Sequence, residues 1–144
     1  MANEFIGIIQ KITAVVRNPQ TMRIALSTVL AVHKPRIFEQ GFDAKGVQIG
    51  TYSTKPASIS KSKQARNTGK TYFAGGYSEY KKAVGKNPGF VILDDTGQMK
   101  ANYGLLGAGN DWGFGFQNNF NYEKSQWMEN KYRKSIFDLS RNEE

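Results

Sequence analysis

The stretch that decides the fold is MKANYGLLGAGNDWGFGF, residues 99–116. Bulky or apolar side chains recur at every second position in both halves, the period of a strand with one buried face. These residues are Met99, Ala101, Tyr103, Leu105, Trp112, Phe114 and Phe116. A Gly-Ala-Gly-Asn-Asp turn at 107–111 separates the halves, so the stretch predicts an antiparallel hairpin. Gly104, Gly113 and Gly115 fall on the opposite face, which indicates close packing there.

Two amphipathic helices are predicted before this hairpin. The first covers residues 3–17, where apolar side chains recur at helical spacing. The second runs from Pro19 to Gln40, with Asn18 as its N-cap and Pro35 expected to kink or split it. Its apolar stripe consists of Met22, Leu26, Val29, Leu30, His33 and Ile37.

Shorter elements are predicted around the hairpin. Strands are expected at 47–49, 90–93 and 136–139, and helices at 77–84 and 122–134.

The third helix and the C-terminal residues carry two further patterns. Trp127 and Tyr132 are predicted to face inward from the helix at 122–134. Ser140 and Glu143 have the spacing of a capping box, in which the glutamate side chain reaches back to the amide of the cap residue.

Together these elements predict an α+β fold. Two N-terminal helices pack on an antiparallel β-sheet, a third helix lies near the C-terminus, and a long basic loop joins the second helix to the sheet. Residues 1–144 are expected to form a single domain, with 45–86 as a basic extended arm or loop insertion. Within that arm, residues 54–68 offer little to bury and are predicted to be an exposed loop.

The net charge of +8 belongs to this arm. Residues 45–86 hold nine basic side chains against Glu79, while the rest of the chain is neutral. Such a segment is suited to contact a neighbouring subunit or the phosphates of DNA. The candidate contact residues are Lys55, Lys61, Lys63, Arg66, Lys70, Lys81, Lys82 and Lys86.

Catalytic, metal and cofactor sites are not expected. The chain has no cysteine and one histidine, His33, which excludes thiolate and multi-histidine metal sites. Gly69-Lys70-Thr71 resembles the end of a Walker A loop, but Gln64 stands where that motif needs its first glycine. Asp94 and Asp95 are interpreted as turn caps, because neighbouring residues point to opposite sides.

Export and membrane insertion are not expected either. Met1-Ala2-Asn3-Glu4 lacks the positive start of a signal peptide. No run of about 18 apolar residues occurs, so no membrane-spanning helix is predicted.

Four stretches, taken in order, carry a family resemblance. They are Arg36-Ile37-Phe38-Glu39-Gln40-Gly41, Gly46-Val47-Gln48-Ile49-Gly50-Thr51-Tyr52-Ser53, Val91-Ile92-Leu93-Asp94-Asp95-Thr96-Gly97-Gln98-Met99 and Ile136-Phe137-Asp138-Leu139-Ser140. With the glycine-rich strand pair, this order resembles tailed-bacteriophage virion morphogenesis proteins, the tail-completion or neck proteins of the Mu and P2 type.

The resemblance implies a structural virion protein without catalysis. Such proteins sit at the head–tail interface, usually as a ring, and are assembled in the cytoplasm of the bacterial host. The implied partners are further copies of the chain, head-connector proteins and tail-tube proteins, with packaged DNA as a further expected contact of the arm. Two alternatives stay open: a nucleic-acid-binding module that uses the basic 45–86 segment, and a small nuclease or hydrolase.

Overall fold

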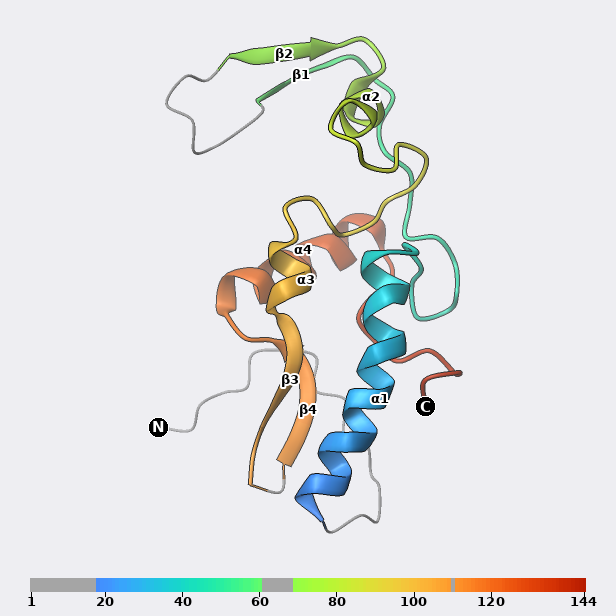
Figure 1. The fold of residues 1–144 in the computed structure, drawn as a ribbon. Coiled ribbons are helices and arrows are strands. Elements are labelled where there is room, and N and C mark those ends of the chain that lie inside the picture. The colour runs from blue at the N-terminus through green and yellow to red at the C-terminus, as the bar shows by residue number, and fades with distance from the viewer. Residues whose placement is uncertain (1–17, 61–68, 110) are drawn as a thin grey trace. The chain divides into compact units, whose positions relative to one another are not determined.

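The computed structural model describes residues 18–60, 69–109 and 111–144, and it confirms the α+β class (Figure 1). The chain divides into two compact units: Met1–Ile49 with Ile92–Glu144, and Gly50–Val91. The helix predicted at 3–17 lies outside the described residues. The described elements are α1 (Pro19–Phe38), β1 (Ala57–Ser60), β2 (Lys70–Phe73), α2 (Gly76–Ala83), α3 (Gln98–Asn102), β3 (Tyr103–Ala108), β4 (Asp111–Phe116) and α4 (Asn119–Tyr132).

Helix α1 begins as the sequence predicts. The Asn18 side chain accepts a hydrogen bond from the Gln20 amide over 2.9 Å, and Pro19 occupies the first helical position. Pro35 does not split the helix, which continues to Phe38. Helical bonding resumes directly after the proline, because the Pro35 carbonyl accepts from the Glu39 amide over 2.9 Å.

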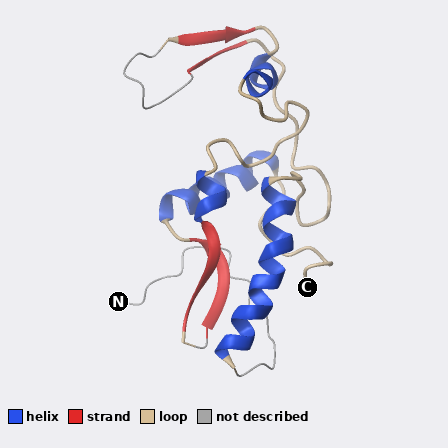
Figure 2. Ribbon diagram, in the orientation of Figure 1, coloured by secondary structure: helices blue, strands red, loops and turns tan. Residues whose placement is uncertain are grey.

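Strands β3 and β4 form the predicted hairpin (Figure 2). Their register pairs Tyr103 with Phe116 and Leu105 with Phe114, which confirms the alternation. The prediction that the first strand already includes Met99 and Ala101 is wrong, because both lie in α3. Gly97, at φ 77°, precedes this short helix, and its carbonyl accepts from the Ala101 amide over 2.8 Å.

Helix α1 packs along the aromatic face of this hairpin (Figure 1). The His33 ring lies 4.9 Å from the Phe114 ring, and the Arg23 guanidinium lies 5.0 Å above the Trp112 ring. The buried apolar side chains of the first unit are Leu26, Ile37, Phe38, Ile49, Leu93, Met99, Tyr103, Phe114, Phe116, Ile136 and Phe137. The core therefore joins residues from α1, the hairpin and the C-terminal segment.

The short strands predicted at 90–93 and 136–139 are wrong. At 47–49 the structure has a single antiparallel bridge, between Gln48 and Phe42, with the Ile49 amide donating to the Gly41 carbonyl over 2.8 Å. Other backbone amides of the three segments bond outside any strand ladder. The Asp43 side chain accepts from the Val47 amide, and the Gly50 carbonyl accepts from the Val91 amide. The Ile136 amide donates to the Glu129 carboxylate over 2.8 Å. Apolar runs of this length are buried without a strand ladder.

Helix α4 is confirmed near its predicted place, but its orientation is not. Asn118 caps it by accepting from the Asn121 amide over 2.9 Å. The prediction that Trp127 faces inward is wrong, since this side chain is 58% exposed. The buried side is instead polar, with Asn121 and Ser125.

The second unit, Gly50–Val91, contains regular structure within the loop expected at 54–68, of which residues 61–68 lie outside the described part of the chain. Strands β1 and β2 pair antiparallel, with Ala57 opposite Phe73 and Ile59 opposite Thr71, so the loop prediction is wrong at 57–60. Alternate residues of β1 are half-buried, which is enough to hold a short strand against its partner and α2. Helix α2 confirms the helix predicted at 77–84.

Candidate functional site

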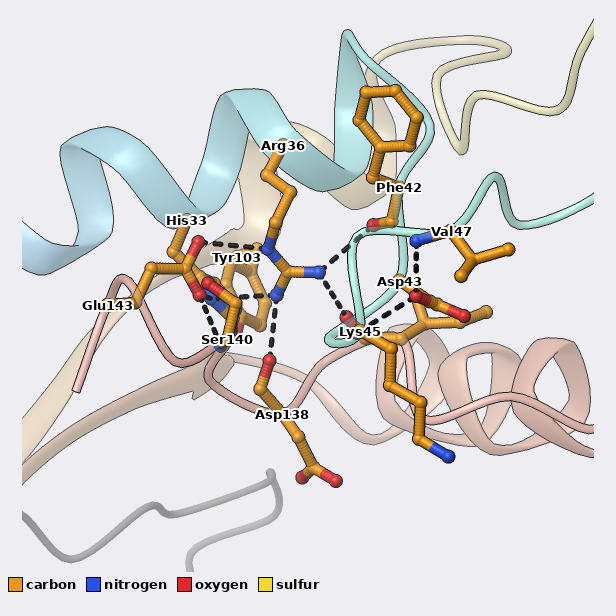
Figure 3. Close-up of polar contacts among 11 residues, drawn as sticks. His33, Arg36, Phe42, Asp43, Lys45, Val47, Tyr103, Asp138, Ser140 and Glu143 are labelled. Carbon is orange, nitrogen blue, oxygen red and sulfur yellow. Dashed lines mark hydrogen bonds and ion pairs between the residues drawn. The ribbon is translucent and has the colours of Figure 1, made fainter.

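A buried polar cluster joins α1 to the C-terminal residues of the first unit (Figure 3). Arg36 comes from the last turns of α1, and Glu143 from the segment after α4. The Arg36 Nε donates to Glu143 Oε1 over 2.9 Å, and both side chains are almost fully buried. We call His33, Arg36, Tyr103 and Glu143 the buried latch, because these four residues tie three parts of the chain together.

His33 uses both ring nitrogens within the buried latch. Its Nδ1 lies 3.0 Å from Glu143 Oε2, and its Nε2 lies 2.9 Å from the Tyr103 hydroxyl. A carboxylate can only accept, so Nδ1 carries the proton and Nε2 accepts from the tyrosine hydroxyl. The ring has no exposed surface, and this hydrogen-bond pattern fits the neutral imidazole.

The Arg36 guanidinium also donates hydrogen bonds to backbone carbonyls that lie outside the helices and strands. Its Nη1 donates to the Phe42 carbonyl over 3.0 Å and to the Ile136 carbonyl over 3.3 Å. Its Nη2 donates to the Asp138 carbonyl over 2.7 Å. One side chain thus satisfies carbonyls of the turn after α1 and of the C-terminal segment, which is the role of a planar five-donor group.

The electrostatics of the buried latch favour neutral His33 and ionised Glu143. Burial lowers the pKa of His33 below its ordinary value of 6.5, although the Glu143 carboxylate works in the other direction. Burial alone would raise the pKa of Glu143, but the Ser140 amide, His33 and Arg36 together bring it below 4.5. Burial raises the pKa of the Tyr103 hydroxyl far above 10, so this group stays protonated.

The glutamate half of the capping box predicted at Ser140 and Glu143 is present, whereas the Glu143 amide bonds the Ser140 carbonyl rather than its hydroxyl. The Ser140 amide donates to Glu143 Oε2 over 2.8 Å, and the Glu143 amide donates to the Ser140 carbonyl over 2.9 Å. This local bond orients the carboxylate toward α1. The pairing of Glu143 with His33 and Arg36 was missed, because it joins residues more than 100 positions apart and leaves no spacing signal in the sequence.

The chemistry of the buried latch is structural in this state. Both nitrogens of His33 are engaged and the ring is fully buried, so it offers no base to a substrate. Among residues 18–60, 69–109 and 111–144, no group of three or more His, Asp or Glu side chains could hold a metal ion.

A groove of about 960 Å³ lies on the outer side of the Arg36 guanidinium. Its walls are the turn after α1 and the C-terminal segment. The charged residues that line it are Arg36, Lys45, Asp138, Arg141 and Glu144. Since these charges are mixed and Arg36 is already fully bonded, the groove favours no single class of ligand.

The structure separates the predicted basic contact residues into different environments. Lys55, Lys70 and Lys82 are exposed, and Lys86 is half-buried. Lys81 is only 2% exposed, and its Nζ lies 5.4 Å from the centres of the Tyr52 and Tyr77 rings. Lys61, Lys63 and Arg66 lie outside the described residues. Lys81 is therefore placed to stabilise the second unit, whereas Lys55, Lys70 and Lys82 extend into solvent.

Comparisons with known proteins give no family assignment. No family model, curated protein or solved structure matches this chain. Within the part of the chain that the structure describes, no helix has the length and apolar character needed to cross a membrane.

Proposed function

We propose that the chain is a structural virion protein of a tailed phage, a tail-completion or neck component that joins head to tail and assembles as a ring. The observation that carries the proposal is the contact between two stretches of the family resemblance. Arg36 is the first residue of the stretch at 36–41. Its guanidinium donates hydrogen bonds to the carbonyls of Ile136 and Asp138, which belong to the stretch at 136–140. Residues that carry the resemblance thus build one shared core.

The arrangement of charge supports an assembly role. The second unit, Gly50–Val91, presents Lys55, Lys70 and Lys82 at its surface, while Glu79 is used to accept from the Gly75 amide over 2.7 Å. A strongly basic unit joined to a nearly neutral one is suited to hold an acidic neighbour, such as a head-connector or tail-tube protein, or to contact packaged DNA.

Head–tail joining in vitro tests this proposal. Heads and tails from a host that expresses all other virion proteins of the phage are mixed with and without the purified chain. Joined particles counted by electron microscopy should appear only with the chain, and sedimentation should give a closed oligomer. A protein that stays monomeric at high concentration and joins no particles would overturn the proposal.

A nucleic-acid-binding module remains the second candidate, and the exposure of Lys55, Lys70 and Lys82 favours it. Phosphate contacts release counterions, so binding to duplex DNA should weaken steeply with salt. The triple variant Lys55→Ala/Lys70→Ala/Lys82→Ala should then lose affinity and show a shallower salt dependence. Retention of both properties in the triple variant would remove this candidate.

A further inference from the structure

We propose that the outer face of the β1–β2 hairpin binds single-stranded nucleic acid, with Tyr72 stacking on a base and Lys70 pairing with a phosphate. This inference deepens the nucleic-acid contact of the proposed function and rests on it, but it depends neither on ring assembly nor on head–tail joining. It is built entirely from described residues of the second unit.

The β1–β2 hairpin has one covered face and one open face. The buried Phe73 ring lies 5.7 Å from the ring of Tyr80 in α2, so α2 packs against the face that carries Phe73. Side chains alternate along a strand, so Lys70 and Tyr72 lie on the opposite face of β2. The register places two serines of β1 directly opposite them. The open face, which we call the hairpin platform, consists of Ser58, Ser60, Lys70 and Tyr72.

The side chains of the hairpin platform suit a nucleotide better than a protein surface. Tyr72 is 65% exposed, and the other three members carry one ammonium and two hydroxyls. The platform thus has no aliphatic side chain to surround the ring, whereas a protein interface is built around a desolvated apolar centre. A base needs only the flat ring, because every base has a face that stacks on an aromatic side chain.

Charge complementarity selects a polyanion as the occupant. The second unit holds eight basic side chains against one carboxylate, Glu79. That carboxylate accepts from the Gly75 amide over 2.7 Å, and no carboxylate of the described residues lies within 4 Å of the Lys70 amine. Phosphates are the anions that such a surface attracts. Only a single strand offers them together with base faces that a ring can reach.

The spacing within the hairpin platform fits this division of roles. Lys70 and Tyr72 are two residues apart on β2, about 7 Å at a rise of about 3.3 Å per residue. A base stacked on the ring therefore has its own or a neighbouring phosphate within reach of the long lysine side chain. Ser58 lies directly opposite Tyr72 in the register, where its hydroxyl can bond the edge of the stacked base.

Fluorescence anisotropy with a labelled thymidine 12-mer tests the stacking step. Tyr72→Phe keeps the ring and should bind like the unmodified chain. Tyr72→Leu keeps an apolar side chain but no flat ring, so its affinity should fall at least about fivefold, the loss of one stacked base. Its binding to a 12-base-pair duplex should change little, which also shows that the variant is folded. Val84→Ser alters another exposed apolar residue of the same unit and should bind like the unmodified chain.

Salt titration tests the phosphate step separately. Each phosphate contact with a single strand adds about 0.7 to the slope of log affinity against log salt. Lys70→Gln should lower this slope by about that amount, while Tyr72→Leu should leave it unchanged because stacking releases no counterions. Lys45→Gln removes the same charge from the first unit and should leave the slope unchanged. Three basic residues stay unmodified in all variants, so that differences belong to the platform: Lys61, Lys63 and Arg66.

The outcomes separate this inference from the function that it deepens. If the chain binds the 12-mer and Tyr72→Leu binds it equally well, the inference is wrong and the nucleic-acid contact stands. Equal losses of Tyr72→Leu on the single strand and the duplex would also overturn it. Displacement of the 12-mer by a glutamate peptide of equal charge, as efficient as by unlabelled 12-mer, would assign the platform to an acidic protein. A chain that binds no nucleic acid would remove both the inference and that contact, and head–tail joining would keep its own test.

Discussion

Arg36 and Glu143 form a buried ion pair, with Nε and Oε1 2.9 Å apart, across 107 positions of sequence. The pair is embedded in further hydrogen bonds from His33 and from the Ser140 amide, so few of its polar atoms are left without a partner. Burying two charges costs desolvation energy that their attraction only partly offsets. The clearest effect of the ion pair is therefore on the specificity of the fold. Any other packing of the C-terminal segment would leave one of the two buried charges without its partner.

Removing the carboxylate of Glu143 should destabilise the protein strongly. Glu143→Gln leaves Arg36 buried without its counter-charge, and breaking one partner of a buried pair costs about 3 to 5 kcal/mol. Urea unfolding followed by tryptophan fluorescence measures this loss. Glu144→Gln, at the exposed neighbouring position, should stay within about 0.5 kcal/mol of the unmodified chain. Equal effects of the two variants would show that the ion pair does not anchor the segment.

Stability should fall as the solution becomes acidic. The folded state holds the pKa of His33 below 6.5, so in acid the unfolded chain binds a proton that the folded chain refuses. Stability is thus fully present above about pH 6.5 and declines as the pH drops toward the lower, folded pKa of His33. Glu143, whose folded pKa lies below 4.5, adds a further loss below that value. Urea midpoints measured from pH 7.5 to 4 follow both steps.

His33→Asn isolates the histidine step of this profile. The amide nitrogen of asparagine can still donate to Glu143 but has no pKa in this range. The variant should be less stable at pH 7.5, because the Tyr103 hydroxyl loses its partner, and its stability should change little between pH 7 and 5. A decline as steep as in the unmodified chain would assign the acid sensitivity to other groups.

The hairpin and α1 could be predicted from sequence because their signals are local. The alternation from Tyr103 to Phe116 and the cap at Asn18 are set by near neighbours. The buried latch could not be predicted as a unit. His33 lies on a predicted apolar stripe and Glu143 in a predicted capping box. Neither pattern predicts a contact between the two side chains.

The orientation of α4 shows a different limit of the sequence. Hydrophobicity places Trp127 inside, but Glu129 accepts from the Ile136 and Phe137 amides of the C-terminal segment, and the Ser125 hydroxyl donates to the Tyr122 carbonyl, so the polar side of α4 turns inward. The strands predicted at 90–93 and 136–139 fail for a related reason, since the Val91 amide donates to the distant Gly50 carbonyl and the Ile136 amide to the Glu129 side chain. Periodicity records which residues are apolar, and it does not record which polar groups need a partner.

Two adjacent lysines of α2 should behave differently. Lys81 is buried, with its amine near the Tyr52 and Tyr77 rings, whereas Lys82 is exposed. Lys81→Ala should lower the stability of the second unit by about 1 to 2 kcal/mol, in the range of a desolvated cation–π contact. Lys82→Ala should leave stability unchanged and affect only partner binding. Hydrogen exchange at residues 70–91 distinguishes them, and equal protection in both variants would contradict the assignment.

Gly76 should be irreplaceable in the second unit. Its φ is +66°, and a Cβ there would lie 2.2 Å from the Lys55 carbonyl oxygen and 2.7 Å from that of Ser53. Since both contacts are backbone, Gly76→Ala must displace the chain that leads into β1 or the start of α2. We expect rapid hydrogen exchange at residues 50–60 and 70–91 in this variant, with α1 still protected, because the first unit has its own core.

Gly85→Ala is the matched control for Gly76→Ala. Gly85 also has a positive φ, +73°, but a Cβ there meets nothing within 4 Å. Its substitution should carry only the conformational cost of a left-handed alanine, about 1 to 2 kcal/mol, and leave the exchange pattern of the second unit recognisable. If Gly85→Ala exposes the second unit as fully as Gly76→Ala does, backbone strain alone explains both. Protection that survives only in Gly85→Ala would show that the close approach of the Lys55 carbonyl requires glycine.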